Sequence, residues 1–311
     1  MSESRTGGAP RAPGSPAVGR ATLLVAFSAC CFGSIAIFVS VATEAGARLV
    51  EVLAWRFMLA AAVLGVIAGG PAVIRREMRR GLPIVLLAGG GQAAIGGLSL
   101  SALRYIPAAT MIFLFYTYPA WVTVISALRG RESLTGRRVL ALGLSLAGIA
   151  VMVGLPGTGS SSVATPGVLL ALAGALLYAL YIPMIDRLGR ELAPAVTAAF
   201  ATSGAAVILA VAALATGGLA ARQSAIVWLM IVLLAIVCTV IAFIAFLRGL
   251  AAIGPVRTAI VSTVEPFWGA FLASVVLGQP LASRTLSGGV LVATAVIILN
   301  LPQRAENAAL A

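Results

Sequence analysis

Residues 111–134 read MIFLFYTYPAWVTVISALRGRESL, and residues 258–281 read TAIVSTVEPFWGAFLASVVLGQPL. Each run is apolar, contains a central proline and ends in a short turn. A shift of 147 positions aligns Pro119 with Pro266, Trp121 with Trp268, Glu132 with Gln279, Leu134 with Leu281 and Arg137 with Arg284. A shift of 146 aligns Leu23, Leu24 and Phe32 with Leu169, Leu170 and Tyr178. Because proline and tryptophan are rare, these matches favour an internal repeat over chance similarity between two apolar stretches.

The composition of the whole chain is that of a membrane protein. Of its 311 residues, 61% are hydrophobic and 10% are charged, and there is no histidine. A soluble domain of this size carries far more charge. Apolar runs near twenty residues recur along the chain, and each is long enough to cross about 30 Å of hydrocarbon as a helix. The runs are apolar on all sides rather than alternating, which excludes a membrane β-barrel. We therefore predict an all-α integral membrane protein.

Ten transmembrane helices are expected, in two five-helix units. The predicted spans are residues 21–41, 49–69, 83–103, 108–128 and 139–155, then 167–185, 194–217, 225–247, 255–277 and 286–301. An odd number of spans per unit makes the second unit enter the membrane from the opposite side, giving the inverted repeat of many secondary transporters. The expected domains are a disordered cytoplasmic tail (1–20), the first repeat (21–155), a linker (156–166), the second repeat (167–301) and a cytoplasmic tail (302–311).

Arginine placement predicts the orientation, because basic loops are retained on the cytoplasmic side. All 21 basic residues are arginines. Sixteen fall on the side of the N-terminus, namely Arg5, Arg11, Arg20, Arg75, Arg76, Arg79, Arg80, Arg129, Arg131, Arg137, Arg138, Arg187, Arg190, Arg248, Arg257 and Arg304. Four fall on the other side, namely Arg48, Arg104, Arg222 and Arg284. This asymmetry predicts a multi-pass protein of the cytoplasmic membrane with both termini in the cytoplasm.

Two charged side chains stand out because they lie well inside predicted spans, away from the span ends. Glu265 is near the middle of the ninth span, and Arg56 is about one-third of the way into the second. A charge at a helix centre costs roughly 2.5 to 3.5 kcal/mol on insertion scales, so it needs a partner or a wet cavity. One interpretation is that both face a central cavity and bind ionic groups of a substrate, or that Glu265 exchanges a proton. The other is a buried ion pair, or separate pairing with backbone carbonyls, that fixes helix packing.

Polar and aromatic residues near Glu265 complete the candidate substrate site. Thr258, Ser262 and Glu265 share one helix face, and Gln92 and Ser99 share another. The fourth span is the most aromatic part of the chain, and the sixth adds two tyrosines. Such rings can stack flat or amphipathic substrates. The predicted substrate-binding residues are Arg56, Gln92, Ser99, Phe115, Tyr116, Tyr118, Tyr178, Tyr181, Ser262 and Glu265.

Pro119 and Pro266 lie at equivalent places in the two repeats. Each removes one helix hydrogen bond near the middle of the bilayer. Paired interruptions of this kind suit bending, so we predict hinges there. The fifth and tenth spans lack charges and are expected to pack at the periphery, while the glycines at positions 89, 90, 91, 96 and 97 are expected to allow close packing of the third span.

Several of these motifs resemble those of a known family. Tyr118-Pro119-Ala120 followed by Arg131-Glu132-Ser133-Leu134 is similar to the repeat ending of the drug/metabolite transporter superfamily, in its ten-helix branch with two EamA repeats. Glu265-Pro266-Phe267 and Gly278-Gln279-Pro280-Leu281 repeat the pattern, although Gln279 departs from the usual glutamate. The segment Cys31-Phe32-Gly33-Ser34 and Arg56 are weaker similarities. The resemblance implies a secondary transporter, with export of amino acids or related amphipathic compounds as the first expectation.

Other functional classes are disfavoured. No P-loop motif supplies an ATP site, so transport must use a gradient of substrate or protons. The arginines are scattered rather than gathered on one face, which argues against nucleic-acid binding. Cys30, Cys31 and Cys238 lie in apolar runs and read as packing residues; no metal or other cofactor is expected. An intramembrane enzyme is disfavoured because paired acids and histidine are absent. A passive channel is the harder alternative to dismiss. Substrate identity and the choice between monomer and homodimer stay open.

Overall fold

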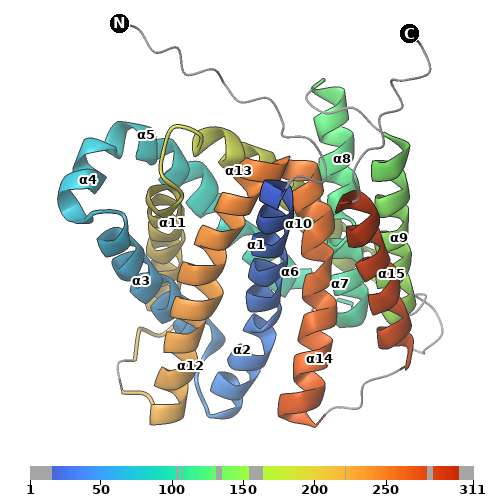
Figure 1. The fold of residues 1–311 in the computed structure, drawn as a ribbon. Coiled ribbons are helices and arrows are strands. Elements are labelled where there is room, and N and C mark those ends of the chain that lie inside the picture. Colours follow the sequence, from blue (N-terminus) through green and yellow to red (C-terminus); the bar gives the residue numbers. More distant parts are fainter. Residues whose placement is uncertain are drawn as a thin grey trace, which may run out of the picture.

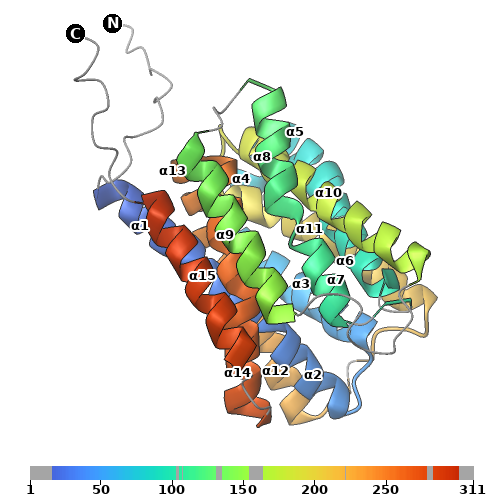
Figure 2. The ribbon, with the colours of Figure 1, turned by 90° about the vertical axis from the view of Figure 1, so that its right-hand side faces the viewer.

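The computed structural model describes residues 16–102, 105–106, 108–130, 135–153, 164–220, 222–278 and 283–300, and these residues form helices without a strand. Figures 1 and 2 show the helices packed side by side in one bundle. The first-half elements are α1 (Pro16–Gly33), α2 (Ile35–Glu44), α3 (Leu49–Ile67), α4 (Gly70–Arg76), α5 (Met78–Pro83), the π-helix η1 (Ile84–Gly89), α6 (Gly90–Ala102), α7 (Ala108–Phe115), α8 (Tyr118–Leu128) and α9 (Gly136–Val153). The second-half elements are α10 (Thr165–Leu188), α11 (Pro194–Ala215), α12 (Ala225–Ala235), the π-helix η2 (Ile236–Ile241), α13 (Ala242–Val261), the 3₁₀ turn η3 (Ser262–Val264), α14 (Glu265–Leu277) and α15 (Ser283–Asn300).

Every predicted span coincides with one helix or a chain of consecutive helical segments. Within the described residues, six helical stretches are long and apolar enough to cross a membrane by themselves, and shorter apolar helices accompany them. The all-α membrane fold predicted from the sequence is therefore confirmed.

The tail boundary needs a correction, because α1 begins at Pro16 and residues 16–20 are helical. A proline is well tolerated in a first helical turn, so the helix can start ahead of the apolar run. Residues 1–15 of the predicted tail, residues 302–311 and most of the predicted linker lie outside the described residues.

Figure 1 also shows how the ends of the helices are distributed. The start of α1, the α4 and α5 segments and the end of α15 lie at one end of the bundle, whereas the start of α12 and the end of α2 lie at the opposite end. The arginines of α4 and α5 thus share an end with the start of α1, as the predicted grouping of basic residues requires. Which end faces the cytoplasm stays a prediction.

The fourth and ninth spans are each interrupted just before their proline. In the fourth span, α7 ends at Phe115 and α8 begins at Tyr118, with Pro119 in its first turn. In the ninth span, the turn η3 separates α13 from α14, and Pro266 lies in the first turn of α14. Proline has no N–H to donate to the preceding turn, so a new helical segment begins at each site. Tyr118 and Glu265, which are equivalent in the repeat, both open such a segment.

Glycines set the closest approaches between helices. A Cβ on Gly89 of η1 would lie 2.5 Å from the Cα of Gly204 on α11, and one on Gly204 would collide with the carbonyl oxygen of Val85. A Cβ on Gly148 of α9 would lie 2.7 Å from the carbonyl oxygen of Gly288 on α15. Figure 2 shows α9 and α15 side by side along one edge of the bundle. Positions 90, 96 and 97 face open space, so only part of the glycine-rich third span uses its small residues for close packing.

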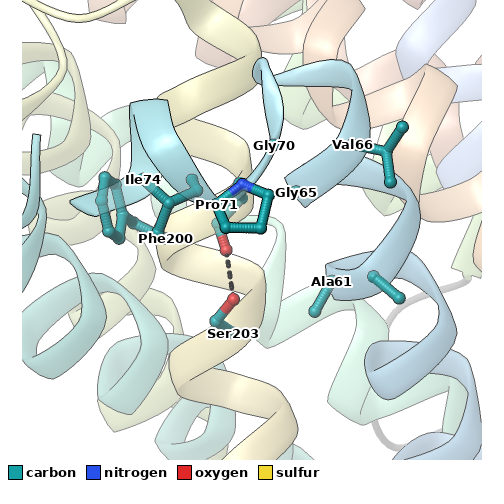
Figure 3. Close-up of a pocket in the computed structure, with 10 residues that line it drawn as sticks. Ala61, Gly65, Val66, Gly70, Pro71, Ile74, Phe200 and Ser203 are labelled. Atoms are coloured by element: carbon teal, nitrogen blue, oxygen red, sulfur yellow. Dashed lines mark hydrogen bonds between the residues drawn. The ribbon is translucent and has the colours of Figure 1, made fainter. Parts of the chain in front are cut away.

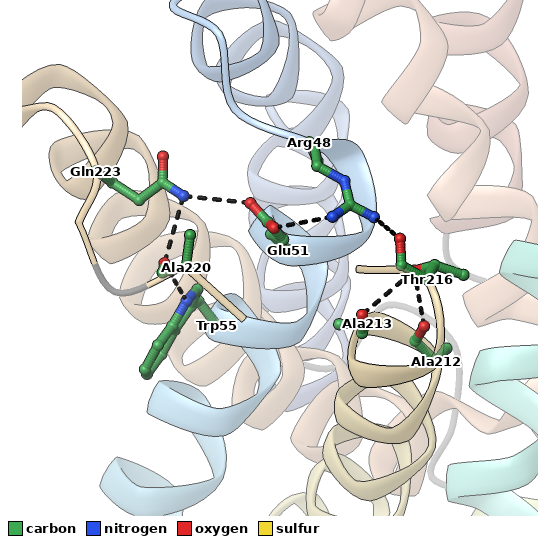
Figure 4. A network of polar contacts seen from close by, with 8 residues as sticks. All are labelled: Arg48, Glu51, Trp55, Ala212, Ala213, Thr216, Ala220 and Gln223. Atoms are coloured by element: carbon green, nitrogen blue, oxygen red, sulfur yellow. Dashed lines mark hydrogen bonds and ion pairs between the residues drawn. The ribbon is translucent and has the colours of Figure 1, made fainter. Parts of the chain in front are cut away.

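A polar network ties the start of α3 to the connection between α11 and α12 (Figure 4). The Glu51 carboxylate is 5% exposed and accepts hydrogen bonds from Arg48 Nη1 at 3.3 Å and Gln223 Nε2 at 3.2 Å. The other end of the Arg48 guanidinium donates to the carbonyl of Thr216. Trp55 Nε1 donates to the carbonyl of Ala220 at 3.3 Å. A single carboxylate therefore anchors side chains from two segments that are distant in the sequence.

We expect Glu51→Ala to lower the free energy of unfolding by about 1.5 to 3 kcal/mol, as for the loss of hydrogen bonds to a charged group. The substitution leaves Arg48 and Gln223 without their shared acceptor. The measurement is thermal unfolding of the purified protein in detergent. Glu44→Ala is the control, because Glu44 is exposed and its carboxylate accepts a hydrogen bond from the neighbouring Ser40 on the same helix. Equal melting temperatures for the two variants would contradict an anchoring role of Glu51.

Candidate substrate site

The structure gathers the predicted aromatic residues of the fourth and sixth spans into one cluster. Tyr178 of α10 is its centre, with ring centroids 5.6 Å from Phe115, 4.7 Å from Tyr118 and 6.0 Å from Tyr181. Tyr116 lies 5.8 Å from both Phe115 and Tyr118. These separations fall within the favourable range for aromatic pairs. Since α7 and α8 belong to the first half of the chain and α10 to the second, the cluster lies where the two halves meet.

Glu265 borders this aromatic cluster. Its side chain lies within electrostatic range of Tyr116, Tyr118 and Tyr178, and the Tyr116 hydroxyl is placed to donate a hydrogen bond to it. Glu265 itself is partly exposed, whereas Tyr116 and Tyr118 are buried. The carboxyl group thus has phenolic hydroxyls as neighbours and forms no ion pair with any described residue. A carboxylate in this setting can take up a proton or a cationic group of a ligand.

Ser262, Gln92 and Ser99 are brought to the same region. Ser262 is buried and interacts through its side chain with Tyr118, whose hydroxyl also lies 3.4 Å from the carbonyl of Ala259. Gln92 of α6 is a neighbour of Tyr181. Within the described part of the chain, neither Gln92 Oε1 nor the Tyr181 hydroxyl completes a well-formed hydrogen bond, although both atoms are buried. Buried polar atoms normally find a partner, so this pair offers binding capacity to a ligand or a water molecule.

Ser99 lies two turns after Gln92 on the same face of α6, and it also faces α10. A Cβ added to Gly174 of α10 would meet Ser99 Oγ at 3.7 Å and the Phe115 ring at 3.8 Å. The small residue at position 174 therefore leaves room beside Phe115 and Ser99. Trp121 of α8, by contrast, is 40% exposed.

Arg56 does not join the aromatic cluster but bonds to η2 instead. Its Nε donates to Thr239 Oγ1 at 2.8 Å, and its Nη2 donates to the carbonyl oxygen of Cys238 at 3.2 Å. Both acceptors, a hydroxyl and a backbone carbonyl, belong to the π-helix η2. Arg56 is buried and forms no ion pair with Glu265 among the described residues. This arrangement matches the structural interpretation, pairing with backbone carbonyls, and a part for Arg56 in substrate binding stays a prediction.

Sequence reasoning missed how closely α1 approaches Glu265. A Cβ on Gly33 would lie 2.5 Å from the Glu265 carbonyl oxygen and 3.3 Å from the Gly269 nitrogen. Trp268 Nε1 donates to Ser34 Oγ at 3.0 Å across the same contact. The segment Cys31-Phe32-Gly33-Ser34 thus positions the backbone that carries Glu265. Gly33 and the repeated tryptophan, Trp268, were the sequence signals for this contact. Neither of them indicates which helix its partner belongs to.

These features define a helical membrane protein of two repeats with a polar and aromatic site at their junction. The model of the EamA-like transporter family matches residues 19–154 and again residues 165–301, and the chain belongs to this family. It is accordingly a membrane transporter of the drug/metabolite type and not an enzyme. One solved crystal structure of a protein has the same fold, with a TM-score of 0.75 and 22% identity over 90% of this chain and 96% of that chain. No curated protein matches the sequence.

Proposed function

We propose that this protein is a secondary active transporter that exports an amino acid or a related amphipathic metabolite across the cytoplasmic membrane by alternating access. The observation that carries the proposal is the position of Glu265, which faces Tyr116, Tyr118 and Tyr178 where the two repeats meet. Secondary transporters built from inverted repeats bind substrate at such junctions, where helices are discontinuous. Both α8 and α14 start at this site, which supports the assignment.

In this proposal the aromatic cluster binds the apolar part of the substrate, and Glu265 binds its amine. Stacking on tyrosine and phenylalanine rings suits an amphipathic compound, and a cation near such rings gains further attraction. Gln92 and Ser99 supply hydrogen bonds from the α6 side. Glu265 also couples transport to protons by releasing the amine when it is protonated. Both termini lie in the cytoplasm.

A counterflow assay in proteoliposomes tests the proposal. Growth protection by expression, measured against toxic amino-acid analogues and amphipathic drugs, first identifies a substrate. Vesicles preloaded with that substrate should then accumulate labelled substrate transiently and with saturation. A passive channel, the alternative considered from the sequence, gives non-saturating flux without counterflow. Flux of that kind would reject the carrier mechanism.

The hinge residues give a separate prediction for the transport rate. We expect Pro119→Ala and Pro266→Ala to slow counterflow severalfold while leaving membrane insertion intact, because each restores a backbone donor and stiffens an interrupted span. The measurement is the initial rate of counterflow at equal protein content. Pro194→Ala is the control, because that proline lies in the first turn of α11 outside the two interrupted spans. Wild-type rates for both hinge variants would count against bending at these sites.

A further inference from the structure

A cavity of about 350 Å³ lies apart from the candidate substrate site (Figure 3). It is bounded by the end of α3, by α4 and by α11, and it shares no residue with the aromatic cluster around Glu265. Its walls include Gly65, Pro71, Ile74, Phe200 and Ser203. The cavity therefore belongs to a different part of the bundle from the proposed transport path.

The lining of this cavity suits a hydrocarbon chain. Ser203 contributes the single polar side chain among the lining residues, and its hydroxyl already donates to the carbonyl of Ala199 at 2.7 Å. The other lining residues contribute only apolar side chains or glycine backbone. Val66, on the rim, is 76% exposed, and its neighbour Ile67 is 51% exposed. Exposed apolar side chains on a membrane protein face lipid, so a ligand reaches this cavity from the bilayer.

A turn of two glycines builds the cavity. Gly69 and Gly70 adopt positive φ angles of 109° and 76°, a conformation that glycine reaches without steric cost. The chain reverses there, and α4 places Pro71 and Ile74 opposite Phe200 and Ser203 of α11, as Figure 3 shows.

Four arginines follow the cavity-lining residue Ile74 in the sequence. Arg75 comes after the lining residue Ile74, and Arg76, Arg79 and Arg80 complete a basic segment across α4 and α5. Arg76 pairs with Glu77 at 3.0 Å, and Arg80 pairs with Glu77 and Glu191 at 3.5 Å. Arg75 and Arg79 are exposed and form no ion pair with the described residues. The chain that lines this apolar cavity thus continues into two exposed arginines, which is complementary to an anionic phospholipid with its acyl chains and negative headgroup.

We infer that this cavity binds an anionic phospholipid, with one acyl chain between α3 and α11 and the headgroup phosphate held by Arg75 and Arg79. Basic segments at the cytoplasmic end of membrane helices attract anionic headgroups. The bound lipid would brace α4 against α11. This inference does not depend on the identity of the transported substrate.

Native mass spectrometry of the full-length protein in detergent tests the site with phosphatidylglycerol and phosphatidylcholine of identical acyl chains. We expect tighter binding of phosphatidylglycerol. Replacing both arginines (Arg75→Gln with Arg79→Gln) should weaken that binding roughly thirtyfold, at about 1 kcal/mol for each arginine. The control double variant is Arg187→Gln with Arg248→Gln, which removes two exposed arginines from α10 and α13 and should bind as the wild type does.

The acyl-chain half of the site has its own variant. Gly65 lines the cavity and a Cβ there meets no atom within 4 Å, so Gly65→Leu should place its side chain in the cavity and weaken both lipids. Gly90→Leu is the matched control at another open glycine and should leave binding unchanged.

Three results would each overturn the assignment of this cavity to an anionic phospholipid. They are equal affinity for the two lipids, unchanged binding by the arginine double variant, and unchanged binding by Gly65→Leu. Binding of glycerol phosphate alone as strongly as the lipid would overturn it too. Counterflow by each variant reports whether the protein is folded.

Discussion

Glu265→Gln should abolish uptake driven by a proton gradient and lower the affinity for the amphipathic amine substrate by roughly 100-fold. The figure follows from loss of a charge interaction of about 3 kcal/mol in a desolvated site. Glutamine retains the shape of glutamate and can still accept a hydrogen bond from Tyr116, so packing at the start of α14 should persist. What disappears is the negative charge and the ability to carry a proton. The measurements are proton-driven uptake and substrate binding in proteoliposomes of equal protein content.

Glu51→Gln is the matched control for this experiment. It neutralises a second carboxylate inside a predicted span, but one that is bonded to Arg48 and Gln223 rather than placed beside the aromatic cluster. Its transport should stay near the wild-type rate. Proton-driven uptake that survives Glu265→Gln would exclude Glu265 as the proton carrier. Counterflow by the same variant would separate a failure of proton coupling from a failure of transport itself.

Gly33→Ala should both destabilise the protein and impair transport. The added Cβ would lie 2.5 Å from the Glu265 carbonyl oxygen, which is closer than real Cβ contacts, and the atom it meets is backbone that cannot rotate away. Helices α1 and α14 must therefore separate, which also strains the bond from Trp268 to Ser34. Overpacking of this kind costs about 1 to 3 kcal/mol. Thermal unfolding in detergent measures the loss of stability, and counterflow measures the displacement of Glu265.

Gly19→Ala on the same helix provides the comparison. No atom lies within 4 Å of a Cβ at that position, and alanine is the better helix former, so stability should hold or rise by up to about 1 kcal/mol. If Gly33→Ala melts and transports as the wild type does, α1 and α14 do not approach as closely as described.

The spans and the repeat could be predicted because the signals are local. A helix that crosses a bilayer needs a fixed length of apolar sequence, so each span is visible in its own residues. The breaks at Pro119 and Pro266 were predictable for the same reason, since proline acts on the turn that precedes it. The positions of the prolines did not reveal that Tyr118 and Glu265 would each begin a new helical segment. That detail depends on how the preceding residues leave the helix, through Tyr116 and Thr117 in one case and through a 3₁₀ turn in the other.

The candidate site was predictable in its residue types but only partly in its arrangement. The aromatic residues of the fourth and sixth spans meet as expected, because both spans present rings at similar depth. The cavity shared by Arg56 and Glu265 stays a prediction, because a side chain at a given depth can face any of several neighbouring helices. The sequence could not show that Arg56 turns toward Thr239 and Cys238 of η2, since no residue pattern in the second span encodes a π-helix in the eighth.

The amino-acid sequence by itself determined that this chain lies in a membrane, that it is helical and that it is built from two similar halves, and it predicted that Glu265 lies near mid-membrane. These properties follow from residue type and spacing along the chain. Only the tertiary structure decided which helices are neighbours: it placed Gly33 against Glu265, gathered the tyrosines around that carboxyl group and opened an apolar cavity beside Arg75. In lipid, apolar side chains gain little by exchanging one apolar neighbour for another, so close packing of small residues and a few hydrogen bonds set the lateral order of helices. Those contacts join residues far apart in the chain.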